Sequence, residues 1–297
     1  MRWLEVLLAV SAELAEAVAD VLARFAPSGV AMSYETGGGP VEVRAYLPED
    51  AADGATQQRV REALWHLSQI QPVPEPTFRW IEDEDWSEAW KAHYKPLAVG
   101  RRLLIVPAWL ASDDADRIPV FLDPGMAFGT GAHPTTRLCL AALEDALHPG
   151  DLVVDIGCGS GILSVAAVLL GADRVLACDI DKHALAATER SAERNGVRHA
   201  IEVFPGSLEQ VLERLQPSGR AGDVLVANIL APVLEAMLGV GATNAVRQGG
   251  ILILSGILAE QSAGVRAAAE RAGLAVLAEE SEGDWRALTL RKGNAAR

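Results

Sequence analysis

The chain has 297 residues, half of them hydrophobic, and this length predicts about two domains with packed cores. Its 26 Lys and Arg residues against 40 Asp and Glu residues give a formal net charge of −14, and residues 1–100 alone contain 8 basic and 16 acidic side chains. Because binding to nucleic-acid phosphates requires clustered Lys and Arg, this balance argues against direct nucleic-acid binding and favours either a basic partner or none.

The cysteine and histidine contents indicate neither disulfides nor a metal site. Cys139, Cys158 and Cys178 form no CxxC pair, and the six histidines form no cluster with metal-ligand spacing. We therefore expect reduced thiols, a cytoplasmic location and no bound metal. No segment approaches the roughly 20 apolar residues that a membrane helix requires, so no membrane association is expected.

The first eighty residues predict a small α+β domain, assigned to residues 1–81. Hydrophobic spacing and turn residues place its elements in the order βαββαβ, which matches the split-βαβ, ferredoxin-like plan. The expected strands are Trp3–Val10, Val30–Glu35, Val41–Leu47 and Thr77–Ile81, and the expected helices are Ala12–Phe25 and Thr56–Ile70.

Residues 82–96 are predicted to be a linker with helical content. The acidic run Glu82–Asp85 suits a helix start, where negative charge favours the helix dipole. Trp86 and Trp90 are four residues apart, which places both on one face of a helix.

Residues 97–297 alternate strands with helices, which predicts parallel βαβ units and a doubly wound, Rossmann-like sheet. The expected strands are Arg102–Val106, Leu152–Ile156, Arg174–Asp179, Ile201–Phe204, Asp223–Asn228, Gly250–Ser255 and Leu274–Glu279, with a late strand within Glu282–Leu290. The expected helices are Thr135–Leu147, Ile162–Leu170, Lys182–Asn195, Leu208–Leu215, Ala231–Val246 and Ala259–Ala272.

A glycine-rich turn is the strongest local sign of a ligand site. An apolar strand runs through Asp155 into Gly157, Gly159 and Gly161, and a helix follows directly. Glycines let the backbone adopt positive φ and approach a ligand closely, although such turns are also purely structural in some proteins. The spacing is GxGxG, whereas dinucleotide folds prefer GxGxxG. Asp155 would repel a pyrophosphate but suits an amino group and a sulfonium, which favours S-adenosylmethionine over NAD.

Two further polar residues, Asp179 and Asn228, end predicted strands. Asp179 lies 18 residues beyond Gly161, close to the roughly 20 expected for a carboxylate on ribose hydroxyls. Asp181 is a competing candidate, but we favour it as the N-cap of the next helix. Asn228 ends an apolar strand; it could simply cap a helix, but in a methyltransferase this position meets the transferred methyl group and the nucleophile.

The segment Asp123–Thr136, DPGMAFGTGAHPTT, resembles the hallmark loop of the methyltransferases of large-subunit ribosomal protein L-eleven. The resemblance covers about residues 85–293, whereas the N-terminal domain matches only by position and predicted topology. The other segments that match this family are Asp85-Trp86, Trp90-Lys91, Asp155–Gly161, Asp179–Asp181, Val226–Leu230, Ser255–Leu258 and Glu282–Trp285.

The resemblance implies a class I methyltransferase domain that binds S-adenosylmethionine. Its cofactor contacts would be Thr136, Gly157, Asp179 and Asn228, to which we add Gly159 of the glycine turn. The targets would be lysine ε-amines and the N-terminal α-amine of the basic ribosomal protein, which become trimethylated. Residues 1 to about 80 would recognise this protein, and the enzyme would act as a monomer.

Asn228 is expected to act in catalysis by accepting hydrogen bonds from the amine and aiming its lone pair at the methyl group. The sequence here reads Asn-Ile-Leu-Ala and lacks the prolines of the Asn/Asp-Pro-Pro-Tyr motif of many glutamine or adenine N-methyltransferases. No convincing general base is found, and His133 is favoured as a residue that orders its loop. The alternatives are a methyltransferase of another protein or of a small-molecule amine, a nicotinamide dehydrogenase, and a non-catalytic binding module.

Overall fold

The computed structural model forms two compact units, Met1–Lys95 and Pro96–Arg297, each described here by itself. Residues 83–94 of the expected linker and residues 123–130 and 132 of the long glycine-rich loop lie outside the described part of the chain. The described residues are 2–26, 29–33, 39–68, 72–82, 95–112, 114–122, 131 and 133–293.

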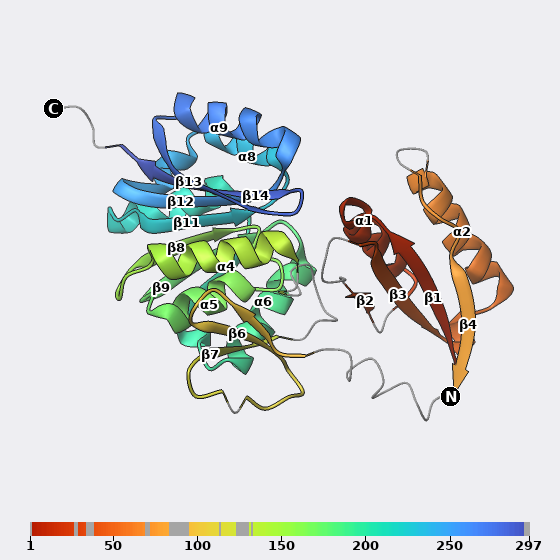
Figure 1. Cartoon of the computed structure of the whole chain (residues 1–297). Helices are drawn as coiled ribbons and strands as arrows, with labels where there is room; N and C mark the ends of the chain where they lie inside the picture. The colour runs from red at the N-terminus through yellow and green to blue at the C-terminus, as the bar shows by residue number, and fades with distance from the viewer. Residues whose placement is uncertain are drawn as a thin grey trace. The chain divides into compact units, whose positions relative to one another are not determined.

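The first unit is a four-stranded antiparallel sheet with the strand order β2-β3-β1-β4 (Figure 1). Its order along the chain is βαββαβ, so the predicted ferredoxin-like arrangement is confirmed. The alternating apolar residues of β1 explain this packing of helices on the sheet, because Leu4, Val6 and Leu8 are buried in one core with the apolar side chains of both helices. The elements are β1 (Arg2–Val10), α1 (Ala12–Ala23), β2 (Val30–Ser33), β3 (Val41–Pro48), a 3-10 turn (Glu49–Ala51), α2 (Gly54–Ser68) and β4 (Thr77–Glu82).

The second unit contains a seven-stranded sheet with the order β10-β9-β8-β11-β12-β14-β13, in which β14 runs antiparallel to both neighbours. The strands of this sheet are β8 (Leu152–Ile156), β9 (Arg174–Asp179), β10 (Ile201–Pro205), β11 (Gly222–Asn228), β12 (Val246–Leu258), β13 (Leu274–Glu282) and β14 (Trp285–Lys292). The α-helices are α4 (Pro134–Ala146), α5 (Ile162–Leu170), α6 (Lys182–Arg194), α7 (Leu208–Leu215), α8 (Ala231–Gly239) and α9 (Ser262–Arg271). Short 3-10 turns occupy Arg198–Ala200, Gln216–Ser218, Ala242–Ala245 and Ala259–Gln261.

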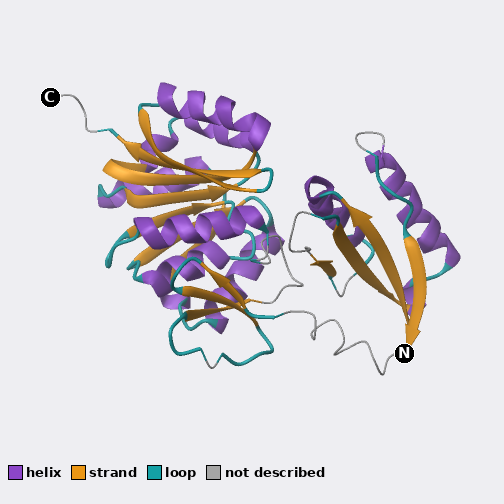
Figure 2. Cartoon of the chain, viewed as in Figure 1, coloured by secondary structure: helices purple, strands orange, loops and turns teal. Residues whose placement is uncertain are grey.

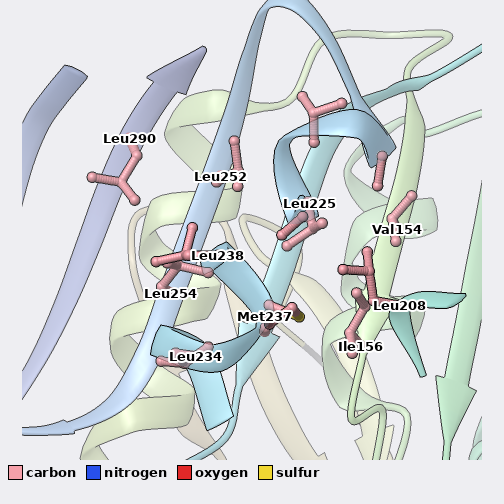
Figure 3. Close-up of a cluster of buried hydrophobic side chains, with 14 of the residues drawn as sticks. Val154, Ile156, Leu208, Leu225, Leu234, Met237, Leu238, Leu252, Leu254 and Leu290 are labelled. Carbon is pink, nitrogen blue, oxygen red and sulfur yellow. The ribbon is translucent and has the colours of Figure 1, made fainter. Parts of the chain in front are cut away.

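Helices cover both faces of this sheet, as a doubly wound fold requires (Figure 2). Alternate residues of each central strand face opposite layers, so Val154 and Ile156 of β8 join the core beneath α7, α8 and α9. Val153 instead joins the core beneath α4, α5 and α6. Figure 3 shows the first core, in which Leu234 of α8 lies among the leucines of β11 and β12.

The register of the parallel strands brings the ends of β8, β9 and β11 to one edge of the sheet. Ile156 of β8 pairs with Cys178 of β9 on one side and with Ala227 of β11 on the other. Ligands of open α/β sheets bind at this carboxyl edge. The sequence therefore predicted both the sheet and the edge at which its polar residues meet.

The structure differs from the predicted elements in two places. A separate three-stranded sheet, in the order β5-β6-β7, contains β6 (Leu103–Pro107) and two strands that the sequence analysis missed, β5 (Leu97–Val99) and β7 (Ile118–Leu122). These strands are only three and five residues long, too short for a clear alternation of polar and apolar residues. The helix predicted over Ala231–Val246 ends at Gly239, because Gly241 adopts a φ of 99° and turns the chain. None of the described helices is long and apolar enough to span a membrane.

Candidate functional site

The turn between β8 and α5 is held by backbone hydrogen bonds from the next strand. The N–H groups of Gly157 and Cys158 both donate to the carbonyl of Cys178, at 2.9 and 3.1 Å. Gly157, Gly159 and Gly161 all have positive φ. A Cβ on Gly157 would lie 2.5 Å from Ile229 Cγ2, and one on Gly161 would lie 2.8 Å from the backbone of Thr188. The backbone here is therefore packed too closely for any side chain.

Asp179 ties this turn to the end of β9. Its Oδ2 accepts a hydrogen bond from the Gly159 N–H at 3.0 Å, and its Oδ1 accepts one from the Asp181 N–H at 2.9 Å. Each carboxylate oxygen retains a lone pair for a further donor such as a ribose hydroxyl. Asp181 itself accepts a hydrogen bond from His183 N–H as the N-cap of α6, the role favoured for it from the sequence.

Asp155 is a fully buried carboxyl group beneath the same turn. Ser164 Oγ donates to its Oδ2 at 2.6 Å, whereas its Oδ1 has no hydrogen-bond partner among the described residues. Burial raises the pKa of Asp155 to about 7, and the nearby charge of Asp179 adds to this effect. A buried oxygen without a donor lowers the stability of the free protein, and a nearby donor or positive charge would offset this cost.

Asn228 lies at the end of β11, on the opposite side of β8 from Asp179. Its Nδ2 is 3.5 Å from the hydroxyl of Thr136, the second threonine of α4. This weak contact points the amide nitrogen toward the protein. Asn228 is half-buried, which suits a side chain that meets a small part of a substrate.

The start of α4 is fixed by a hairpin far away in sequence. His133 caps the helix through its Nδ1, 2.7 Å from the Thr135 hydroxyl, and its ring packs edge-on against Trp285 with centroids 4.9 Å apart. Arg137 forms an ion pair with Glu282 of the same hairpin. Burial lowers the pKa of His133 to about 4, so the neutral ring orders the helix start and would be a weak base.

Two exposed apolar side chains beside these polar residues were missed in the sequence analysis. Ile180 follows Asp179 and is 85% exposed, and Leu230 follows Asn228 and Ile229 and is 71% exposed. Their exposure at the ends of the strands that carry Asp179 and Asn228 makes both side chains candidates for ligand contact. Hydrophobicity alone could not reveal them, because it predicts burial for both.

The charges and the close-packed backbone of these residues suit S-adenosylmethionine. A glycine backbone without room for side chains, a carboxylate with free lone pairs and a buried carboxyl oxygen without a donor meet at adjoining strand ends. All five predicted site residues lie at this edge: Asp179 contacts Gly159, Asn228 contacts Thr136, and Gly157 packs against Ile229. The described residues contain no group of three or more side chains arranged to hold a metal ion, and their three cysteines are buried free thiols.

Comparisons with known proteins match almost the whole chain. A family model described as ribosomal protein L11 methyltransferase (PrmA) matches residues 2–293. The chain is 39% identical to a protein of that name from Chloroflexus aurantiacus, over 98% of both chains. It is 40% identical to one from Pelotomaculum thermopropionicum, over 98% of this chain and 99% of the relative. A crystal structure of a ribosomal protein L11 methylase from Lactobacillus delbrueckii subsp. bulgaricus is 32% identical, with a TM-score of 0.60, and covers 68% of this chain and 100% of its own.

Asp179→Asn should weaken binding of S-adenosylmethionine at least tenfold. The amide has one acceptor oxygen in place of two and carries no charge, so it accepts fewer hydrogen bonds from the cofactor. Isothermal titration calorimetry measures this change. The matched control is Asp181→Ala, which removes the N-cap of α6 at a cost of about 1 kcal/mol in stability but should leave the affinity unchanged. Equal affinities of Asp179→Asn and the unmodified protein would remove Asp179 from the site.

Asp155→Asn should stabilise the cofactor-free protein above pH 7 while weakening cofactor binding. The folded-state pKa of Asp155 is raised, so the folded state holds this proton more tightly than the unfolded state does, and stability falls as pH rises from about 4 to about 7. The asparagine removes this loss, which is on the order of a few kcal/mol at most.

Thermal unfolding between pH 5 and 9 measures this effect, with Asp173→Asn, an exposed carboxylate of the same unit, as the control. A Tm advantage of Asp155→Asn should grow with pH and level off above about pH 7. A pH-independent advantage, or none, would show that Asp155 is not protonated in the folded protein at neutral pH.

Proposed function

Because this chain belongs to the ribosomal protein L11 methyltransferase family, we propose that it transfers methyl groups from S-adenosylmethionine to amines of ribosomal protein L11. The family membership confirms the resemblance inferred from the sequence. The observation that best supports this function is that the glycine turn, Asp179 and Asn228 lie at one edge of the sheet. In this proposal the strand order β9-β8-β11 puts the nucleoside on the β9 side of β8 and the acceptor amine on the β11 side.

In the proposed assignment, the backbone of Gly157 and Gly159 lies against the cofactor, and Asp179 accepts its ribose hydroxyls. Asp155 faces its amino group with the carboxyl oxygen that has no partner among the described residues. Thr136 contributes its hydroxyl, and exposed Ile180 offers an apolar surface to the adenine ring. When bound, the sulfonium supplies an activated methyl group.

Asn228 positions the acceptor amine. Its Nδ2 points toward Thr136, which leaves Oδ1 to accept an N–H of the amine and to orient the nitrogen lone pair. The amine must first lose a proton, since the pKa of a free lysine is about 10.4. Burial in the site lowers that pKa because it disfavours the charged form, so the neutral amine forms without a dedicated base. His133 is engaged at the start of α4 and takes no part in this step.

The acceptor amines and the recognition domain are assigned here as the resemblance to the family implies. The acceptors are lysine ε-amines and the N-terminal α-amine, and the first unit, Met1–Lys95, recognises the ribosomal protein. A net charge of −14 suits a basic protein partner and disfavours direct contact with RNA. The enzyme acts as a monomer in the cytoplasm, where its three buried cysteines stay reduced.

The assay that tests this function uses radiolabelled S-adenosylmethionine with purified ribosomal proteins. Label on L11 alone is the expected result. Label on a different protein, or on a small-molecule amine in a cell extract but not on L11, would overturn the proposal in favour of the corresponding alternative substrate. Mass spectrometry of labelled L11 then identifies the modified amines.

Asn228→Ala should lower kcat for L11 roughly a hundredfold, because it removes a positioned hydrogen-bond acceptor, and should change cofactor affinity much less. Asn228→Asp is the matched variant: it keeps an acceptor oxygen and should retain more activity than Asn228→Ala. Steady-state kinetics and calorimetry separate the two effects. An unchanged kcat in Asn228→Ala would contradict the positioning role.

Deleting residues 1–80 should abolish methylation of L11 but preserve binding of S-adenosylmethionine, since the described site residues all belong to the second unit. Calorimetry with the truncated protein tests the binding, and the radiolabel assay tests the activity. Full methylation of L11 by the truncated protein would refute the recognition role of the first unit.

A further inference from the structure

Helix α8 carries an apolar stripe on the face that points away from the protein core. Leu230, Val233 and Val240 are 71%, 50% and 76% exposed, and Ala236 between them is exposed as well. Val233, Ala236 and Val240 are spaced three and four residues apart, which places them along one side of the helix, whereas Leu230 precedes the helix as its N-cap with a non-helical backbone. The opposite side is also apolar, since Leu234, Met237 and Leu238 pack into the core (Figure 3).

The composition of α8 is unusual for a helix with a solvent-facing side. Its sequence, APVLEAMLG, contains one charged residue, Glu235. Surface helices of globular proteins normally carry polar residues on their outer face, so an apolar outer face indicates a surface that something covers. The stretch from Asn228 to Val240 contains no Lys or Arg, which disfavours a phosphate-rich partner for this helix.

The amino-terminal end of the stripe adjoins the amine-binding residue. Leu230 follows Asn228 by two residues and is the N-cap of α8. The intervening Ile229 is fixed: its N–H donates to Ser255 O at 3.1 Å, and its side chain packs over the position of Gly157. Ile229 therefore turns toward the glycine turn, while the side chain of Leu230 stays exposed.

The cofactor side of the edge does not account for this exposed end. The proposed cofactor contacts Gly159 and Asp179 lie in the turn after β8 and at the end of β9, whereas α8 follows β11 on the other side of β8. Leu230 and Val233 are the exposed apolar residues that follow Asn228 most closely along the chain, at the N-cap and in the first turn of α8. Val240 is ten residues farther along, about 15 Å at the rise of an α-helix.

We propose that Leu230 and Val233 are substrate-contact residues that hold the polypeptide segment carrying the acceptor amine while that amine lies at Asn228. This proposal rests on the proposed methylation of L11. The two side chains contact apolar parts of the substrate segment on either side of the acceptor residue. They thereby set the affinity for the protein substrate and leave the chemical step to Asn228.

The test compares Leu230→Asn and Val233→Gln with Val240→Asn in the full-length protein. Asparagine is a favoured N-cap residue, and glutamine has a higher helix propensity than valine, so neither of the first two changes should disturb α8. Val240→Asn serves as the matched control. Val240 is about as exposed as Leu230 and lies at the far end of α8 from Asn228, and this substitution also replaces an apolar side chain with a polar one.

We expect the KM for L11 to rise about tenfold in Leu230→Asn and in Val233→Gln, with kcat and the calorimetric affinity for S-adenosylmethionine unchanged. Val240→Asn should behave like the unmodified enzyme. Unchanged KM values in the first two variants, or an equal rise in Val240→Asn, would overturn the proposal.

Size-exclusion chromatography distinguishes the other possible occupant, a second copy of the chain. A dimer that dissociates in Leu230→Asn would assign the stripe to self-association and overturn the proposal. A monomer with the expected KM change supports it. If the unmodified enzyme bound cofactor but did not methylate L11, the proposed function itself would fail, which is a separate outcome from normal KM values in the variants.

Discussion

The hydrogen bond between the Gly159 N–H and Asp179 is the interaction on which the candidate site depends. It joins the turn after β8 to the end of β9, and the carbonyl of Cys178 reinforces it by accepting from Gly157 and Cys158. These contacts exist only because β8 and β9 are parallel and in register, so the order of the sheet determines the shape of the cofactor side. The same carboxylate that shapes the turn keeps lone pairs for a ligand.

Asp155 illustrates how a binding site lowers the stability of its own fold. Its carboxyl group is fully buried, one of its oxygens lacks a partner among the described residues, and its pKa is raised to about 7. An apolar residue would be more stable at this position in the free protein. In the proposed function a cationic ligand would offset this cost, because it would supply a donor and the opposite charge.

The amine side is built differently, from residues that distant segments hold in place. Thr136 owes its position to the start of α4, which is fixed by His133 against Trp285 and by Arg137 with Glu282. The hairpin of β13 and β14 therefore supports a site to which it contributes no predicted contact residue. The matching segments of the L11 methyltransferase family include this hairpin, and its packing against α4 gives a physical reason for that.

Local sequence patterns were sufficient to predict the class of fold, the carboxyl edge of the sheet and most of the polar residues there. Periodic apolar strands, the glycine turn and the acidic residues that follow it are local patterns with direct physical meanings. Tertiary structure alone decided what depends on distant contacts: the raised pKa of Asp155, the capping role of His133 against Trp285 and the short strands β5 and β7. The exposure of Ile180 and Leu230 also depends on tertiary structure. The hydrophobicity of a side chain measures how strongly it favours burial, but the packing of the fold determines whether a neighbouring surface is available to bury it.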